Sequence, residues 1–421
     1  MKKNKNNFAS LMRRTFGGII SRRDPAELFV IIMALSVTVW TVFYLCLGNG
    51  RFSDLFFLRT GDLFMDYFNS VRDAAQGPGV YTERNVIYPP LANLLFLAIS
   101  QFAPHGYNNT AFFDRKNWLN YSSAIILFVL IARACTLVVY TLFRENLKRK
   151  KWLAVIFGFF CVFNASTLYM IERGNVLILC LISIAIFAFT YNSENKVVRE
   201  IGIIALAVAA ALKLYPALFM WFFISDKRYK ELIRCLAYFS VLMILPSFFF
   251  GGPKCIITLL KNTFGFSAKK GTSSSAITVL AKLIHVPAKI VSLGAYTWCL
   301  INLLSFMASP FLNEERWKSF VKGTLLILTA PPLTSQYVWC FFLIALVLLC
   351  NTREKATKKD FLFLVPMFIP FLFIVLRFNY YLTTNTVLVF VCTAVLSGIC
   401  VVDTVISFRK ARLAKKNTVT E

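Results

Sequence analysis

Two acidic side chains stand four residues apart in the segment GDLFMDYFNS, which begins at Gly61. If this stretch is helical, the spacing puts Asp62 and Asp66 on one face. A carboxylate in a partly apolar setting has a raised pKa, so it can act as a general base near neutral pH. An exposed helix N-terminus is the simpler alternative, because aspartate is common there.

Two basic side chains occur at positions where apolar segments end. Arg173 belongs to the turn Glu-Arg-Gly-Asn, and Lys213 lies three residues before Pro216 in an otherwise apolar stretch. Either cation could bind a phosphate group, arginine through its planar fork and lysine as a point charge. The alternative is that they reach toward lipid headgroups.

Other chemistries lack the residues they need. His105 and His285 are the only histidines and lie far apart in the sequence, so a histidine-based metal site is not expected. No Walker loop or GxGxxG motif opens a helix, which argues against nucleotide binding. We expect no cofactor, although a divalent metal held by Asp62 and Asp66 stays open.

The composition is that of a membrane protein. Of the 421 residues, 58% are hydrophobic and only 16% are charged, with a mean hydropathy of +0.65. Soluble domains are closer to half apolar and a quarter charged. The net charge of +26 could suggest nucleic acid, but the basic residues form short clusters between apolar spans, which is the positive-inside pattern. We therefore predict an all-α polytopic membrane protein that binds no nucleic acid.

The charge clusters also predict the topology. The basic segment 1–25 places the N-terminus in the cytoplasm, and the first span is followed by an exported loop over about 49–118. Within that loop, residues 88–102 are too short for a span and suit an interfacial helix. The transmembrane domain then extends over 26–408 and ends in a basic cytoplasmic tail, 409–421.

Residues 201–225 are ambiguous, because they form either one span or a hairpin with Lys213 at its outer tip. The hairpin places 16 lysines and arginines of the later loops inside and 7 outside, whereas a single span reverses these numbers. We therefore favour the hairpin, which gives about twelve crossings, both termini inside and a second exported loop over 251–290. Six lysines and no acid in that loop fit this rule poorly.

Four short stretches resemble the GT-C superfamily of membrane glycosyltransferases, and most closely the bacterial polyprenyl-phosphate-mannose-dependent alpha-1,2-mannosyltransferases. The exported loop has an aspartate followed by aromatic residues, then Gly-Val-Tyr and Tyr-Pro-Pro-Leu. Arg173-Gly174-Asn175 opens a helix, and an Ala-Leu-Lys-Leu-Tyr-Pro stretch and an Ala-Pro-Pro stretch follow. Their order and spacing cover roughly residues 30–340.

The resemblance implies a GT-C-like fold whose exported loops carry short interfacial helices. It also implies an inverting transfer of a hexose, which is mannose in this family, from a polyprenyl-phosphate donor to a hydroxyl of a glycolipid or glycan acceptor. Asp62 best matches the position of the family's catalytic base, and Asp66 is second. The other site residues that it implies are Arg173, Asn175, Lys213 and Tyr215 at the donor phosphate, and Tyr81, Tyr88 and Gln336 at other substrate positions. Relatives often carry a histidine near the position of Gln336.

The resemblance also implies a bacterial plasma membrane protein with its site on the exported face. Three other functions remain open. A non-catalytic membrane scaffold would not need an acidic exported loop that faces cationic helix ends. A lipid-linked oligosaccharide ligase or polymerase would share the donor and the compartment. A lipid or sugar transporter would favour charged residues near the bilayer midplane and inverted repeats.

Overall fold

The structure is a computed structural model that describes residues 23–47, 63–103, 122–270, 287–312, 314–330, 336–374 and 384–418. Throughout these ranges the regular elements are helices, and none is a strand. The α-helices are α2 (Pro25–Leu47), α3 (Met65–Ala74), α4 (Pro90–Ser100), α6 (Ser122–Asn146), α7 (Lys151–Val162), α8 (Ala165–Arg173), α9 (Leu177–Thr190), α10 (Lys196–Leu212), α11 (Trp221–Ser225), α12 (Tyr229–Ser247), α13 (Lys254–Lys270), α15 (Ala288–Ala308), α16 (Arg316–Thr329), α17 (Phe342–Thr352), α18 (Lys358–Phe368) and α19 (Thr384–Thr418). Short 3₁₀ turns are η3 (Gly77–Val80), η5 (Tyr215–Met220), η6 (Phe248–Phe250), η7 (Ser309–Leu312), η8 (Gln336–Phe341) and η9 (Ile369–Phe371).

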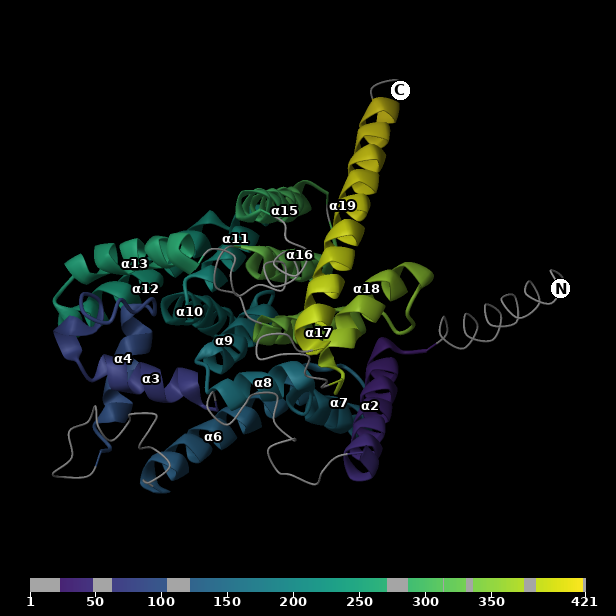
Figure 1. Cartoon of the computed structure of the whole chain (residues 1–421). Helices are drawn as coiled ribbons and strands as arrows, with labels where there is room; N and C mark the ends of the chain where they lie inside the picture. The colour runs from purple at the N-terminus through teal and green to yellow at the C-terminus, as the bar shows by residue number, and fades with distance from the viewer. Residues whose placement is uncertain are drawn as a thin grey trace.

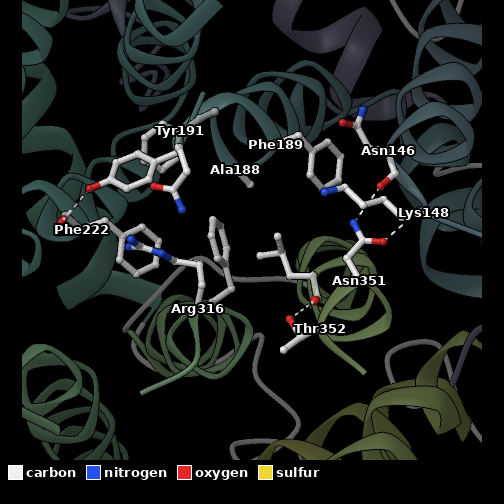
Figure 2. Close-up of a pocket in the computed structure, with 13 residues that line it drawn as sticks. Asn146, Lys148, Ala188, Phe189, Tyr191, Phe222, Arg316, Asn351 and Thr352 are labelled. Atoms are coloured by element: carbon white, nitrogen blue, oxygen red, sulfur yellow. Dashed lines mark hydrogen bonds between the residues drawn. The ribbon is translucent and has the colours of Figure 1, made fainter. Parts of the chain in front are cut away.

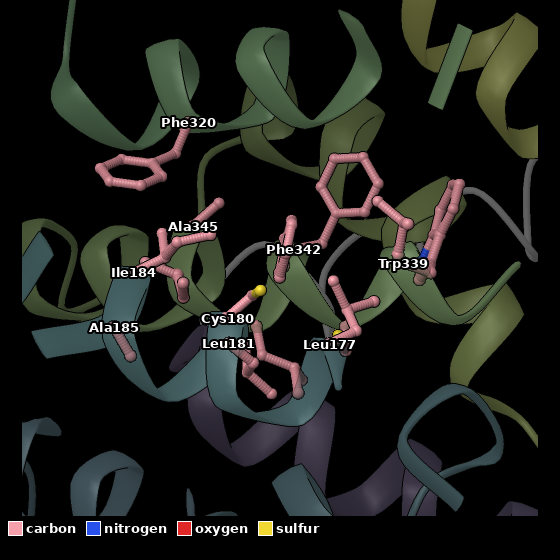
Figure 3. Packing of buried hydrophobic residues seen from close by; sticks show 14 of the residues in the cluster. Leu177, Cys180, Leu181, Ile184, Ala185, Phe320, Trp339, Phe342 and Ala345 are labelled. Carbon is pink, nitrogen blue, oxygen red and sulfur yellow. The ribbon is translucent and has the colours of Figure 1, made fainter. Parts of the chain in front are cut away.

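Helices of two kinds form the bundle (Figure 1). Short apolar helices such as α9 and α17 lie at its centre, and eight of the eleven residues of α17 are buried. A helix that is apolar all round must be covered on all sides. Figure 3 shows this contact, with Cys180, Leu181 and Ile184 of α9 facing Phe342 and Ala345 of α17.

Long helices at the edge of the bundle leave large apolar side chains exposed. Leu45 of α2 is 72% exposed and Leu137 of α6 is 63% exposed. Such surfaces are costly in water and favourable in lipid. Five helices of the described ranges are long and apolar enough to cross a membrane, or six if α7 and α8 form one span bent by 46°. The polytopic all-α class is thereby confirmed, and the count of twelve crossings stays a prediction.

The apolar stretch 153–171, which is long enough for a single span, is interrupted between α7 and α8. Asn164 accepts a hydrogen bond from the backbone N–H of Thr167 and so caps a new helix, α8. Its amide also donates to the carbonyl groups of Phe160 and Cys161 at the end of α7. A polar side chain that satisfies both helix ends stabilises a bend inside an apolar segment.

The chain reverses direction at Lys213, which is what the hairpin interpretation requires. The Lys213 side chain lies beside Tyr88 at one end of α10. At the other end, the Tyr191 hydroxyl donates to the Phe222 carbonyl, and Arg228 donates to the carbonyl of Tyr191. Because Tyr191 follows α9 directly, α11 has returned to the end of the bundle at which α10 began.

Short helices also occur within both predicted exported loops. The first loop contains α3, η3 and α4, and the second contains α13. Helix α3 packs against α4, which packs in turn against α10 and α12. Helix α19 continues as one helix to Thr418 and so includes most of the predicted basic tail, whose cytoplasmic location stays a prediction.

Candidate functional site

Five separate chain segments meet near the start of α3, the ends of α8 and α10, and the turns before α4 and α17. They contribute Asp66, Tyr88, Arg173, Asn175, Lys213, Tyr215 and Tyr337, which we call the Asp66 cluster. Five predicted donor or substrate residues and one predicted catalytic residue are thereby brought together.

The turn between α8 and α9 places the first two polar residues. Gly174 has a φ of 64°, and the N–H groups of Gly174 and Asn175 donate to the carbonyl groups of Ile171 and Met170. This Schellman arrangement closes α8 directly after Arg173. The Asn175 carbonyl oxygen Oδ1 then accepts the N–H of Leu177, which opens α9 and directs the amide nitrogen into the cluster.

Asp66 lies at the start of α3 and contacts the turn between α8 and α9. The N–H of Phe64 donates to the carbonyl of Glu172 at 2.7 Å, so the start of α3 is fixed against the end of α8. Arg173 forms an ion pair with Oδ1 of Asp66, and the Asn175 amide donates to Oδ2 at 2.6 Å. Both oxygens of the carboxylate are therefore oriented, and the Asp66 side chain is 16% exposed.

The helix around Asp66 begins later than the sequence suggests. Helix α3 starts at Met65, and Phe64 has a left-handed φ of 54°. That residue interrupts helical geometry between the two aspartates, so their spacing of four does not put them on one helical face. Asp62 lies outside the described residues, and its predicted role as the base stays a prediction.

Lys213 is surrounded by aromatic rings. Its Nζ lies 5.3 Å from the ring centre of Tyr88, 5.7 Å from that of Tyr215 and 5.6 Å from that of Tyr337. Cation–π contacts of this kind stabilise an ammonium group. No carboxylate within the described ranges forms an ion pair with Lys213. Burial lowers the pKa of its ammonium group, whereas the nearby Asp66 carboxylate raises it. An anion bound beside Lys213 would favour the charged form further.

The tyrosine hydroxyls complete the polar surface. Asn175 donates to the hydroxyl oxygens of Tyr337 at 3.2 Å and Tyr88 at 3.5 Å. Burial raises the pKa of Tyr88 well above its ordinary value, and the nearby Asp66 carboxylate adds to this shift, so the phenol is neutral at physiological pH. The buried hydroxyl of Tyr215 has no hydrogen-bond partner among the described atoms. Such groups are rare in folded proteins, so this hydroxyl requires an explanation.

Of the predicted substrate residues, Tyr81 lies outside the Asp66 cluster, and only the backbone of Gln336 is described. Tyr81 is 1% exposed, and its hydroxyl donates to the Tyr88 carbonyl at 2.9 Å and accepts from Asn93. It therefore fixes Tyr88 from behind and lies outside the cluster. Gln336 begins η8, but its side chain is not among the described ones.

Sequence reasoning missed Tyr337 as a site residue. It follows Gln336 directly, and its ring stacks on that of Tyr169 with centroids 6.0 Å apart. The only signal in the sequence is its place at the end of the fourth family-like stretch.

Metal ligands are sparse around the cluster. Across the ranges that the structure describes, no three histidine, cysteine, aspartate or glutamate side chains lie close enough together to hold a metal ion. Asp66 is the one carboxylate among the cluster residues named above.

A separate cavity of about 300 Å³ lies at the opposite end of α9 (Figure 2). Arg316 stacks on Tyr191 and Phe222 on one side of it, and Asn351 and Lys148 lie on the other. It contains none of the residues of the Asp66 cluster.

The family assignment follows from the same segments. The family model described as glycosyltransferase family 87 matches residues 86–331, more than half of the chain. The chain belongs to glycosyltransferase family 87. This membership supports a membrane glycosyltransferase of the GT-C type, as the sequence predicted. No curated protein and no solved structure matches the chain.

The family 87 match covers most of the cluster but not all of it. It includes Tyr88, Arg173, Asn175, Lys213 and Tyr215. Asp66 precedes the matched range, and Tyr337 follows it. These two residues join the family segment only through contacts in space, with Asn175 bonded to both.

Proposed function

We propose that this family 87 enzyme transfers a hexose from a polyprenyl-phosphate donor to a hydroxyl group of a glycolipid, glycan or other cell-envelope acceptor. The observation that carries the proposal is the position of Lys213, whose ammonium group lies among three tyrosine rings without a carboxylate ion pair among the described residues. A partly buried lysine near an oriented carboxylate suits a reaction in which a phosphate leaves as a proton is removed.

The proposed reaction is a single displacement at the anomeric carbon. The acceptor oxygen attacks that carbon, and the bond from the carbon to the phosphate oxygen breaks with its electron pair remaining on the phosphate. The acceptor proton passes to the base. Because the acceptor oxygen attacks the face opposite to the departing phosphate in a single displacement, the configuration inverts. Lys213 stabilises the negative charge that develops on the phosphate, and the Tyr215 hydroxyl donates a hydrogen bond to it.

We assign the base to Asp66. Arg173 and Asn175 each engage one carboxylate oxygen, yet an ionised carboxylate has about four acceptor positions. Two positions therefore remain for an acceptor hydroxyl. Arg173 fixes the carboxylate, and its other N–H groups are suitable for the donor phosphate. Asp62, the base that the sequence favours, is the competing assignment.

Resemblance to the mannosyltransferases favours mannose as the sugar. The charge distribution of the loops favours an exported site with both termini in the cytoplasm of a bacterial cell. A lipid donor would enter from the bilayer. Tyr88 precedes α4 and Lys213 follows α10, and both helices pack against α12. Helix α12 exposes apolar side chains, so this side of the bundle suits contact with lipid.

A donor panel tests the proposal. The purified chain in nanodiscs is offered polyprenyl-phosphate mannose, glucose or galactose, or GDP-mannose, with membrane extract as the acceptor source. We expect transfer of one hexose from a polyprenyl-phosphate donor and none from the nucleotide sugar. Transfer from GDP-mannose alone would contradict the proposal. Transfer of a whole oligosaccharide from a polyprenyl-diphosphate donor would replace it with a ligase.

A further inference from the structure

Helix α13 has an exposed apolar face that no part of the described chain covers. Ile257, Leu260 and Phe264 are spaced by three and four residues, so they line one face of the helix. They are 58%, 42% and 72% exposed. The opposite face, with Cys255 and Leu259, is buried against η6 and the segment around Tyr81.

This face continues the apolar surface of a candidate membrane span. Phe248 and Phe249, at the end of the candidate span that contains α12, are 63% and 57% exposed. Gly251 and Gly252 then turn the chain with φ values of 91° and 80°, and α13 begins two residues later. In Figure 1, α13 lies beside α12 at the edge of the bundle.

The charge on α13 is of one sign. The helix sequence KCIITLLKNTFGFSAKK contains four lysines and no acid, and the Lys254 and Lys261 side chains are exposed. An amphipathic helix with lysines and exposed Phe, Leu and Ile side chains suits the interface of a membrane that contains anionic lipid. This accounts for the basic bias of a loop that the positive-inside rule leaves unexplained.

The buried face of α13 is linked to the Asp66 cluster by hydrogen bonds. The Asn262 amide donates to the Tyr81 carbonyl at 2.8 Å and to the Val86 carbonyl at 3.3 Å. The Tyr81 hydroxyl donates in turn to the carbonyl of Tyr88. Tyr88 places its ring over Lys213, so only a few bonds separate α13 from the cation of the cluster.

We propose that α13 is an interfacial helix that binds an anionic lipid surface, and that Asn262 is a positioning residue which couples its seating to Tyr88. The effect on transfer rests on the proposed function, whereas lipid binding and the position of residues 80–88 do not. Loss of lipid contact or of Asn262 would loosen the Tyr81–Tyr88 segment and displace the aromatic wall around Lys213.

The first experiment measures the environment of the apolar face. Among the described cysteines, Cys46 is the exposed one, so the full chain carries Cys46→Ser together with Phe264→Cys, labelled with an environment-sensitive fluorophore. Nanodiscs contain phosphatidylcholine alone or an equal mixture with phosphatidylglycerol. A label at Glu354→Cys, in a different loop, is the water-exposed control. We expect an apolar environment at position 264, stronger with phosphatidylglycerol.

The charge dependence is tested with matched variants. Lys254→Gln with Lys261→Gln should remove the gain from phosphatidylglycerol, whereas Lys230→Gln, an exposed lysine at the far end of α12, should retain it. A label at position 264 that is as water-exposed as the label at 354 in both lipids would overturn the proposal. If the double lysine variant kept the more apolar environment with phosphatidylglycerol, the proposal would also be overturned.

The coupling is read by hydrogen exchange of residues 80–88, which needs no activity. Asn262→Ala removes two hydrogen bonds and should speed exchange of this segment roughly tenfold. It should also lower transfer in the donor panel. Thr258→Val, one turn earlier on α13, is the control, because its hydroxyl bonds only within its own helix. Unchanged exchange in Asn262→Ala would overturn the coupling, and a chain that transfers no sugar would overturn only the proposed function.

Discussion

The amide nitrogen of Asn175 lies 2.6 Å from Oδ2 of Asp66, although 109 residues separate them in the chain. Asn175 is 4% exposed and also donates to the Tyr337 hydroxyl. This one side chain therefore orients the carboxylate and links it to the aromatic wall of the cluster. Replacing its amide with a carboxylate changes the charge at the centre of the site while keeping the size.

Asn175→Asp should move the acidic limb of the pH–activity profile, on which activity rises with pH, to higher pH. Two carboxylates this close cannot easily both ionise, so the apparent pKa of the pair is raised. The base is then ionised only at higher pH, and the rise of kcat with pH shifts upward. The pH profile of kcat checks this. Asn195→Asp, at the exposed N-cap of α10, is the control and should leave the profile unchanged.

Lys213→Met should weaken use of the lipid-phosphate donor. Methionine keeps much of the length and fills the space between the rings but cannot bind an anion. Loss of a charge-assisted hydrogen bond costs about 1.5–3 kcal/mol, which is roughly a tenfold to hundredfold loss in kcat/KM for the donor. Lys230→Met is the matched control. Normal donor kinetics in Lys213→Met would remove the lysine from the phosphate site.

Gly174→Ala should destabilise the fold more than Gly77→Ala. Both glycines have a φ near 60°, so both substitutions carry the same backbone strain. A Cβ on Gly174 would lie 2.6 Å from Cβ of Tyr67, whereas one on Gly77 meets nothing within 4 Å. In thermal unfolding in detergent, the free energy of unfolding should fall by about 1 kcal/mol in Gly77→Ala and by about 3 kcal/mol or more in Gly174→Ala. Equal losses would mean that α3 and α8 are not in close contact.

A buried ion pair far from the cluster provides a stability test. Lys322 and Glu314 have side chains that are 0% and 3% exposed, with Nζ 2.5 Å from Oε1, and Lys322 also bonds to Thr404 on α19. Lys322→Met alone should cost about 3–5 kcal/mol, because it leaves a carboxylate buried without a partner. Lys322→Met with Glu314→Gln should recover much of this loss. Additive losses in a double-mutant cycle would show that the two side chains do not interact.

The sequence predicted the residues of the cluster better than their arrangement. Arg173, Asn175 and Lys213 were found because each interrupts an apolar segment, where a polar residue is costly and therefore conspicuous. The reversal of the chain at Lys213 was predicted from the charge count of the later loops, because a single span would place most of their lysines and arginines outside.

The missed features depend on contacts between distant parts of the chain. Asn175 and Tyr337 are 162 residues apart, and a tyrosine after an apolar stretch looks like an ordinary interfacial residue. The start of α3 at Met65 is set by Phe64 bonding to Glu172, a contact that no local pattern contains. The bend at Asn164 was missed because one polar residue rarely ends an apolar helix.

The central claim is that the Asp66 cluster carries out the transfer, and single-turnover rates of two variants test it directly. Asp66→Asn keeps size and polarity but cannot accept the proton, so the rate should fall by about a hundredfold to ten-thousandfold. Donor binding should be retained. Asp62→Asn is the comparison and should lose less. Near-normal turnover in Asp66→Asn beside an inactive Asp62→Asn would contradict the assignment and transfer the role of base to Asp62.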